Sequence, residues 1–293
     1  MTGKTEISYL SIPAGRGVNL AATWVRPADS SPGGNWIVIG SAMAAQRRFY
    51  QPLAEFLAGR GYQVITFDHR GIGDSADTHP RANKSSLSDW GQLDLEAVLQ
   101  WTMNRGQAER TYLIGHSLGA QLPGIAPSAT HIAGLIMVNA TSGYWRNWSG
   151  LYQAGIFFAF HIVIPLLCRV FGYLPGRVLG KGESVPAGVA REWASWGRHP
   201  DYICRPDTGP RPRVFDKIEA PILCWAIEDD PLAPAKAVNA LLDFYSSAEI
   251  TRRAVSIKES RHAPLGHWGW FRESQSRPLW EETADWLDRQ SQL

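Results

Sequence analysis

Short apolar segments that alternate with helical patterns place the strongest constraint on how this chain of 293 residues folds. Four of these segments are predicted strands: 36–39, 63–67, 110–114 and 133–138. The first is continuously apolar, as a strand covered on both faces of a sheet must be. A helical pattern lies between the first two, at 47–58, where apolar residues share one face and glycines follow. Strands that alternate with helices predict a mostly parallel sheet flanked by helices.

Both ends of the chain extend this pattern. Residues 7–12 and 19–25 predict a hairpin, because Gly15 and Gly17 lie between them. The remaining predicted elements are helices at 88–104, 234–245 and 278–289 and strands at 221–226 and 249–257. A chain of this length buries about three quarters of its unfolded surface, so it forms a core without disulfides or a structural metal.

The alternation breaks down between residues 143 and 212, a segment rich in aromatic residues and glycine with no clear strand. We therefore expect one domain, with a core formed by residues 1–142 and 213–293 and a helical cap inserted at 143–212. More than half of a set of nine aromatic side chains in the insertion is expected to form the cap's own small core. The set is Tyr144, Trp145, Trp148, Tyr152, Phe157, Phe158, Phe160, Trp193 and Trp196.

The charge balance and the cysteines exclude several classes of protein. The 29 basic and 27 acidic residues give a net charge of +2, so no concentrated basic face for nucleic acid is expected. The one short basic cluster, Arg47 and Arg48, is interpreted as a solvated helix start. Cys168, Cys204 and Cys224 are odd in number and widely spaced, which indicates neither a disulfide framework nor a zinc site. We predict a reduced cytoplasmic protein without a metal or another cofactor.

The sequence also bears on membrane association. The N-terminal segment lacks the apolar core of a signal peptide. The most apolar run, Ala154–Cys168, is shorter than the roughly 20 residues that span a bilayer, and His161 and Pro165 interrupt it. A buried or lid helix is the favoured interpretation, and an interfacial contact with lipid is the alternative. No stable membrane anchor is expected, and a homo-oligomer remains open.

The segment Gly115-His116-Ser117-Leu118-Gly119 follows an apolar strand and precedes a stretch compatible with a helix. A strand-to-helix turn of this kind exposes the serine in a strained conformation, and its neighbours must be small because strand and helix approach closely. The turn also directs the backbone N–H of Leu118 towards a reacting carbonyl. Ser117 is therefore the predicted nucleophile, and the alternative is a tight turn with an inert serine.

A serine hydroxyl needs a histidine base that is itself oriented by a carboxylate. Asp230 follows a late strand, and His267 follows the last strand, in a loop whose glycines permit a close approach. Asp229 is the main alternative for the acid, and His262 is the alternative for the base. The predicted triad is Ser117, Asp230 and His267.

The loop after the strand at 36–39 is expected to supply the second backbone N–H of an oxyanion hole. Met43 is the first candidate in this loop and Ala42 the second, and the alternative is a plain connector. His116 is expected to be a packing residue, because its side chain points away from the serine. No two histidines or carboxylates show the spacing of metal ligands on one element.

The turn at 68–75 resembles the D-x-R-G-x-G-x-S turn of α/β-hydrolases. Five further motifs resemble, in their order along the chain, a bacterial group of predicted α/β-hydrolases whose activity is largely unassigned. They are Arg48-Phe49-Tyr50, the turn at 115–119, Ser142-Gly143-Tyr144-Trp145-Arg146, Asp229-Asp230-Pro231 and residues 266–272. The resemblance implies the α/β-hydrolase fold with a sheet of eight strands, and the triad named above. The charges of the turn at 68–75 are expected to be structural. This chain has Ser41-Ala42 where many relatives carry His-Gly.

The triad predicts a serine hydrolase that cleaves a carboxylic ester or a thioester through an acyl-serine intermediate. The alternatives are an acyltransferase with the same triad and a non-catalytic ligand-binding protein of the same fold. Dehalogenase and epoxide-hydrolase chemistry in this fold would require an aspartate at position 117. In this fold the insertion covers the nucleophile, so we expect a small apolar or aromatic substrate. Its predicted contacts are Tyr144, Trp145, Trp193 and Trp268.

Overall fold

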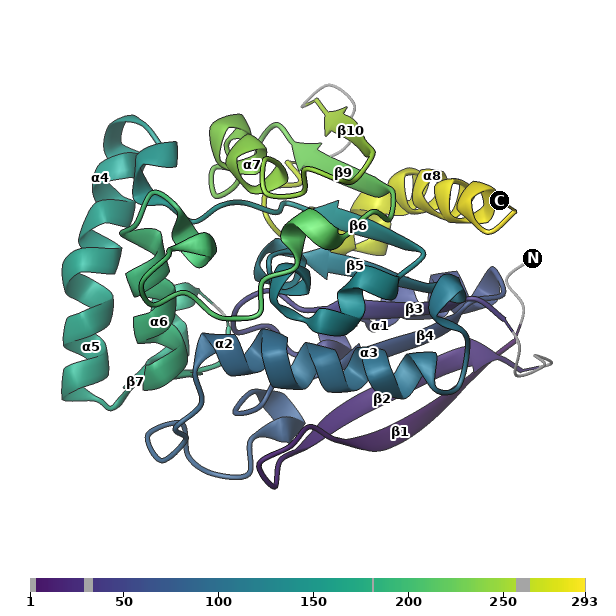
Figure 1. The fold of residues 1–293 in the computed structure, drawn as a ribbon, viewed down its shortest axis with the longest axis horizontal. Coiled ribbons are helices and arrows are strands. Elements are labelled where there is room, and N and C mark those ends of the chain that lie inside the picture. The colour runs from purple at the N-terminus through teal and green to yellow at the C-terminus, as the bar shows by residue number, and fades with distance from the viewer. Residues whose placement is uncertain (1–3, 29–33, 181, 257–263, 293) are drawn as a thin grey trace.

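The computed structural model describes residues 4–28, 34–180, 182–256 and 264–292. Among these residues, eight strands form one sheet in the order β1-β2-β4-β3-β5-β6-β9-β10 (Figure 1). β2 is antiparallel to both of its neighbours, and all other neighbouring pairs in this sheet are parallel. The strands are Thr5–Pro13 (β1), Asn19–Pro27 (β2), Trp36–Gly40 (β3), Gln63–Phe67 (β4), Thr111–His116 (β5), Gly134–Val138 (β6), Ile222–Ile227 (β9) and Ile250–Val255 (β10). The predicted mostly parallel sheet is confirmed.

The sheet separates two hydrophobic cores. On one face, α1 (Gln51–Gly59) and α8 (Glu273–Gln290) pack side chains such as Leu57 and Trp280, which are fully buried. On the other face, α3 (Glu96–Met103) and α7 (Ala235–Leu242) pack together with residues of the insertion. The helices thus cover both faces, as continuous apolar strands require.

The helix predicted at 88–104 forms as one run of α2 (Leu87–Asp89), a π-helical turn (Trp90–Leu95) and α3. It begins with a capping box, in which the Ser86 hydroxyl accepts the Asp89 N–H and the Asp89 carboxylate accepts the Ser86 N–H. These two bonds satisfy donors that the first helical turn leaves free.

The stretch after Ser117 differs from the helix expected there. It forms two 3₁₀ turns, Ser117–Ala120 and Leu122–Ile125. Pro123 has no N–H to donate to an α-helical ladder. Gly124 lies against the ring of Phe215, where an added Cβ would be 2.1 Å from ring carbons. The missing N–H of Pro123 and the close packing of Gly124 both favour short turns over a regular helix.

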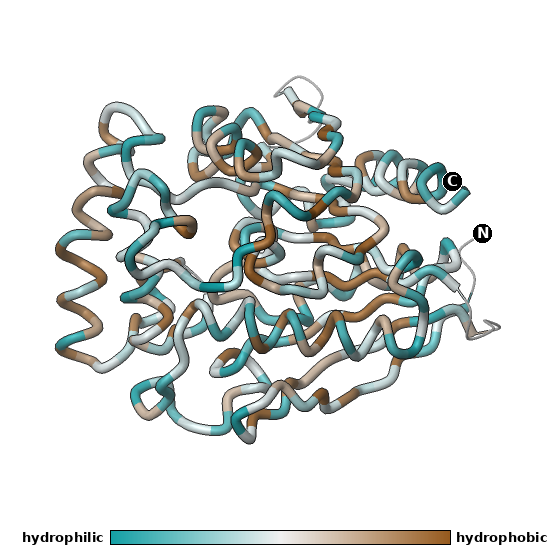
Figure 2. The backbone as a smooth tube through the Cα atoms, in the orientation of Figure 1, coloured by the Kyte–Doolittle hydropathy of each residue, from teal (hydrophilic) through white to brown (hydrophobic). Residues whose placement is uncertain are grey.

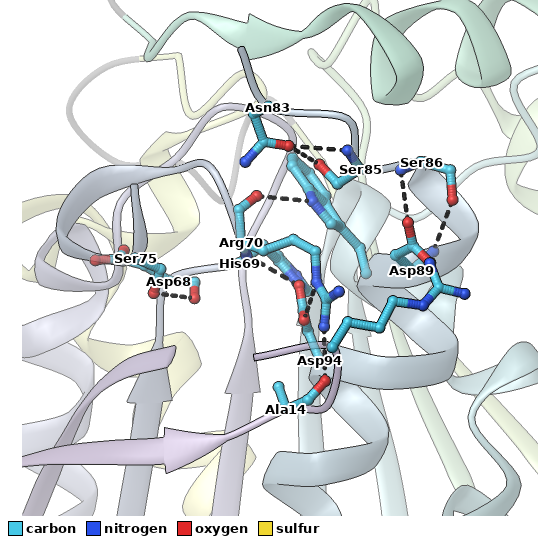
Figure 3. Close-up of polar contacts among 12 residues, drawn as sticks. Ala14, Asp68, His69, Arg70, Ser75, Asn83, Ser85, Ser86, Asp89 and Asp94 are labelled. Atoms are coloured by element: carbon cyan, nitrogen blue, oxygen red, sulfur yellow. Dashed lines mark hydrogen bonds and ion pairs between the residues drawn. The ribbon is translucent and has the colours of Figure 1, made fainter. Parts of the chain in front are cut away.

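The turn at 68–75 is tied to the connection of the N-terminal hairpin and to Asp94 of the π-helical turn (Figure 3). The buried Arg70 side chain binds the Asp94 carboxylate at 2.6 Å and donates to the Ala14 carbonyl at 2.8 Å. The Ser75 hydroxyl donates to the Asp68 carbonyl at 2.7 Å. Buried charges need such partners, and all of these contacts are made within the protein. The charges of this turn are therefore structural, as expected.

Arg47 is buried, which corrects its interpretation as part of a solvated helix start. Its guanidinium forms ion pairs with Asp68 and Asp74, and its backbone N–H donates to Asp68 at 2.6 Å. Arg48 is exposed and lies 3.1 Å from Asp74. The two carboxylates come from the turn at 68–75, which folds back onto the start of the helix, so sequence neighbours could not reveal this burial.

The insertion contains a long helix, a short hairpin and α6 (Ala187–Gly197). The long helix is continuous from α4 (Gly150–Phe158) through a π-helical turn (Ala159–Val163) to α5 (Ile164–Val170). The hairpin pairs β7 (Tyr173–Leu174) with β8 (Val185–Pro186), so the expectation of no strand in this segment was wrong. Figure 1 shows these helices beyond the carboxyl ends of the parallel strands. The domain division at 143 and 212 remains a prediction.

The aromatic residues of the insertion are less buried than expected. Only Trp148, Phe160 and Trp196 of the nine are buried, whereas Tyr152 and Phe158 are more than half exposed. The long helix forms the outermost layer of the insertion, and no described element covers its outer face. The expectation that more than half of the set forms a cap core was therefore wrong.

Candidate active site

Ser117 follows β5 directly and has a φ of +52°. A positive φ is uncommon for residues with a side chain and is typically held by close packing. The packing is tight on both sides of the serine. A Cβ added to Gly119 would lie 2.2 Å from the Gly40 oxygen, and one added to Gly115 would lie 2.5 Å from the Ala120 Cα. The two glycines thus allow β3, β5 and the following turn to meet, and the serine is held at the carboxyl end of the sheet.

His267 and Asp230 lie side by side at this same end. The Nδ1 atom of His267 is 2.6 Å from Oδ2 of Asp230, and the Asp230 carboxylate is buried. The other carboxylate oxygen accepts the Leu232 N–H at 2.9 Å, which fixes the orientation of the acid. When Nδ1 carries the proton donated to the carboxylate, Nε2 is left as a base.

Ser117 and His267 line one small cavity. No hydrogen bond joins their side chains in the part of the chain that the structure describes. Catalytic hydrogen bonds are often long before a substrate binds and tighten in the complex. The structure therefore brings the three predicted triad residues to one place, while their catalytic roles remain a prediction.

Asp229, the alternative acid, has a different set of partners. Its two carboxylate oxygens accept the N–H groups of Leu265 and Gly266, each at 2.8 Å. This carboxylate therefore holds the loop that carries His267 rather than the imidazole itself. His262, the alternative base, lies outside the described residues.

His116 links the elbow to both neighbouring loops. Its Nε2 lies 2.8 Å from the backbone carbonyl of His267, and its Nδ1 lies 2.9 Å from the Tyr50 hydroxyl. A carbonyl only accepts, so Nε2 carries the proton and Nδ1 accepts from Tyr50. The Tyr50 oxygen in turn accepts the Ala42 N–H at 2.8 Å. Burial, with the nearby charge of His267, holds the pKa of His116 well below its usual value, so the ring is neutral.

The His267 loop has a third support that sequence reasoning missed. The Asn139 side chain donates to the carbonyls of Gly266 and His267 at 3.2 and 3.1 Å. Asn139 follows β6 and has a φ of +52°, a conformation that asparagine tolerates better than most residues. The sequence signal that could have found Asn139 is its position directly after a predicted parallel strand, because the carboxyl ends of parallel strands meet at one edge of the sheet.

The hydrogen bond from Ala42 to Tyr50 separates the two oxyanion candidates. The Ala42 N–H is already donated, so it is not free for an oxyanion. Met43 and Leu118 both line the cavity beside Ser117. Their backbone N–H groups are therefore the better pair, and this role remains a prediction.

The cavity has a volume of about 160 Å³ and is mainly apolar. Trp193 and Trp268 line it, as predicted for substrate contacts. Tyr144 and Trp145 are not among its lining residues, so the prediction for these two is not supported. Trp145 instead packs against Phe157, with ring centroids 4.9 Å apart. Further lining side chains that were not predicted are Gln121, Thr141, Trp148, Ile156, Phe160, Leu179 and Leu232.

A second cavity of about 640 Å³ adjoins the first and shares Leu179 and Trp268 with it. Arg48, Glu183 and Arg272 contribute to its lining. The site thus combines a narrow apolar compartment at Ser117 with a wider compartment that has charged side chains of both signs.

Among the described residues, the cysteines and the possible metal ligands do not form a site of their own. In the described ranges, no group of three or more histidine, cysteine or acidic side chains is placed to hold a metal ion. The three cysteines are free. Burial raises the pKa of the Cys204 thiol to about 11 and that of Cys224 to about 12, so neither is a thiolate near neutral pH.

Residues 31–275 match the profile of the alpha/beta hydrolase family. The chain belongs to the alpha/beta hydrolase family. A comparison with curated proteins gave no match. The family assignment agrees with the order and direction of the strands around the serine elbow.

Several solved structures resemble this family member over nearly its whole length. A soluble variant of monoglyceride lipase from Saccharomyces cerevisiae, in complex with a substrate analog, has a TM-score of 0.67 at 14% identity, covering 99% of this chain and 96% of that one. Est1E from Butyrivibrio proteoclasticus, with ferulic acid bound, has a TM-score of 0.60 at 16% identity, covering 97% and 100%. Brefeldin A esterase, described as a bacterial homologue of human hormone sensitive lipase, has a TM-score of 0.61 at 15% identity, covering 99% and 78%. At such low identities these likenesses establish the fold alone.

Proposed function

We propose that this protein is a serine hydrolase that cleaves a carboxylic ester or a thioester. One observation carries the proposal: the imidazole of His267 is held at 2.6 Å by a buried carboxylate, in the same cavity as a serine with a positive φ. A base oriented by a carboxylate beside a serine is the arrangement that nucleophilic catalysis requires.

In the first step, the Ser117 oxygen attacks the carbonyl carbon and His267 Nε2 takes the hydroxyl proton. The Asp230 carboxylate stabilises the imidazolium that forms. The developing negative charge on the carbonyl oxygen is stabilised by the N–H groups of Leu118 and Met43. The imidazolium then protonates the leaving alcohol or thiol as the bond to the carbonyl carbon breaks.

In the second step, His267 removes a proton from water, and the resulting hydroxide attacks the acyl-serine. The bond between the carbonyl carbon and the Ser117 oxygen breaks, and the serine takes back a proton from the imidazolium. The carboxylic acid then leaves and the enzyme returns to its starting state.

The two compartments suggest how the substrate lies. The narrow cavity at Ser117 is apolar and suits a neutral acyl group of modest size. The wider compartment then receives the leaving group, and its lining, which includes Arg48, Glu183 and Arg272, offers polar partners to an alcohol or a thiol carrier. A chain-length series of p-nitrophenyl esters should therefore peak at short to medium acyl chains.

Labelling with a fluorophosphonate probe tests the proposal directly. The wild-type protein should be labelled at Ser117, and Ser117→Ala should abolish labelling and lower kcat by roughly 10³-fold or more. A screen of p-nitrophenyl esters and acyl-thioesters, with and without alcohol or amine acceptors, then identifies the substrate class and the acceptor. Retention of most activity in Ser117→Ala would refute the proposal.

A further inference from the structure

The long helix of the insertion is mainly apolar, yet much of it is exposed. The helix Gly150–Val170 has 21 residues, which by length and composition alone is enough to cross a membrane, and 17% of its most apolar window is buried. This corrects the expectation that the apolar run is too short, because the helix extends beyond the run at both ends. Hydrophobic residues recur along it at the edge of the molecule in Figure 2.

Pro165 does not end this helix. The π-helical turn Ala159–Val163 precedes it and loosens the backbone ladder at that point. The Phe160 carbonyl, five residues before the proline, accepts a hydrogen bond from the Arg198 side chain at 2.9 Å. A donor from outside the helix thus takes the place of the N–H that proline lacks.

The inner face of the helix is firmly attached to the protein. Phe160, Ile164 and Cys168 are nearly fully buried, and the Arg191 side chain donates to the Cys168 carbonyl at 3.0 Å. At Gly197 of α6, an added Cβ would lie 2.3 Å from the Phe160 ring. A transmembrane orientation would break these contacts, so the helix stays on the protein surface and cannot span a bilayer in this fold.

The outer face consists of Leu151, Phe158, Ile162, Leu166 and Val170, which follow one another at helical spacing. Leu151 is 91% exposed, and the other four are 49–60% exposed. A contiguous apolar surface of this kind costs free energy in water unless something covers it. A helix that is apolar all round is normally buried in a protein core or in lipid.

The charged side chains of the helix and of the segments that directly precede and follow it are basic. The sequence has no acidic residue between Glu109 and Glu183. Arg146, Arg169 and Arg177 are exposed near the ends of the helix. On the neighbouring α6 the acidic residue is Glu192. Its carboxylate accepts hydrogen bonds from the Ser88 hydroxyl at 2.6 Å and from the Ser88 N–H at 2.8 Å. The surface therefore pairs an apolar centre with cationic ends.

This charge pattern distinguishes between possible occupants. A two-fold contact between two copies of the face would bring the arginines of both copies together without carboxylates to offset them. An anionic lipid surface offers hydrocarbon for the apolar side chains and headgroup charges for the arginines, which can extend their guanidinium groups outward.

We propose that the outer face of the helix Gly150–Val170 docks this protein reversibly on anionic lipid surfaces, with the helix lying in the plane of the interface. Ile156 and Phe160 of the same helix line the cavity that contains Ser117 and His267. Docking therefore fixes on the lipid a helix whose inner face lines the candidate active site. The docking itself does not depend on the proposed hydrolysis.

Co-sedimentation of the full chain with vesicles tests the proposal, using phosphatidylcholine alone or mixed with phosphatidylglycerol. We expect tighter binding to the mixed vesicles and weaker binding as salt is raised. Ile162→Gln/Leu166→Gln should weaken binding at least about tenfold, because two apolar side chains no longer enter the lipid. The matched control is Ile7→Gln/Tyr9→Gln on β1, where two apolar side chains are also exposed, and it should bind like the wild type.

Two further variants make the result specific. Arg169→Gln should weaken binding to the mixed vesicles about fivefold and leave binding to phosphatidylcholine unchanged. Ser117→Ala should bind like the wild type, so a failure of the proposed hydrolysis leaves the docking result intact. The proposal is overturned by absence of co-sedimentation with both vesicles, by equal affinity for both, or by unchanged binding of Ile162→Gln/Leu166→Gln. A dimer that this double variant dissociates, without vesicle binding by the wild type, would assign the face to a second copy instead.

Discussion

The loops around Ser117 and the long helix of the insertion line the same cavity. They differ in whether their side chains find partners within the protein. Around the serine, polar groups from distant segments bind one another: Asp229, Asn139 and His116 all bond the backbone of residues 265–267. Along the helix, only the inner face has partners within the described protein, and large apolar side chains face outward.

The difference reflects two physical demands. Catalytic groups must be held to within a fraction of an ångström, and hydrogen bonds in a buried setting provide that rigidity. Side chains that contact a lipid surface need a large apolar area rather than a fixed orientation, because hydrophobic contact is not directional. Substitutions should therefore change turnover in the first region and surface properties in the second.

The sharpest comparison within the first region is between the two adjacent aspartates. Asp230→Asn should lower kcat roughly 10³–10⁴-fold, because an amide no longer stabilises the imidazolium or the correct tautomer. Asp229→Asn should cost much less, since an amide oxygen still accepts one of the two loop N–H groups. Steady-state kinetics on the best ester found by screening measure both. A larger loss in Asp229→Asn would reverse the two roles.

The two faces of the long helix provide the next test. Ile164→Ala on the inner face should lower the free energy of unfolding by about 2–5 kcal/mol, as loss of a buried isoleucine does. Leu166→Ala on the outer face should change it by less than about 0.5 kcal/mol in the absence of lipid. Urea denaturation measures both variants. Equal losses would mean that the outer face is covered in solution.

Tyr50 tests whether the hydrogen-bond chain through His116 positions the site. Tyr50→Phe leaves the Ala42 N–H and the His116 Nδ1 without their partner in a buried setting, at a cost of about 1–3 kcal/mol in stability. We also expect a lower kcat with little change in KM, because the oxyanion loop and the His267 loop lose a common support.

Tyr62→Phe is the matched control for Tyr50. The Tyr62 hydroxyl donates to Asp288 at 2.5 Å, away from the cavity. This variant should lose stability without a change in kcat. If both variants lower kcat alike, the effect of Tyr50→Phe is a general loss of stability rather than positioning.

The smallest expected effect is the dependence of stability on pH through His116. Because its pKa is depressed by burial, the unfolded chain takes up a proton below about pH 6.5 while the folded protein does not. This contribution to stability is therefore complete above that pH and is lost as the pH falls, by at most about 1.4 kcal/mol per pH unit. Thermal unfolding from pH 7.5 to pH 5 should show a shallower fall in His116→Asn than in the wild type. Parallel curves would contradict the assignment.

Much of the fold and of the candidate site was predictable because the signals are local. Continuous apolar strands, the glycines beside Ser117 and the order of Ser117, Asp230 and His267 arise from sterics and periodicity over a few residues. These features determined the α/β sheet and the loops that the candidate residues occupy. The structure agrees with the sheet and brings the three residues together.

The tertiary structure decided what depends on partners far apart in the sequence. Asp229 and Asp230 are neighbours in the chain. Only the packing of the 265–267 loop decides that Asp229 binds the backbone N–H groups of this loop and that Asp230 binds the His267 imidazole. The link from Tyr50 through His116 to His267 spans 66 and then 151 residues of sequence. The exposure of the outer helix face was equally hidden, because composition determines that a helix is apolar, whereas the elements packed against it determine which of its sides remains uncovered.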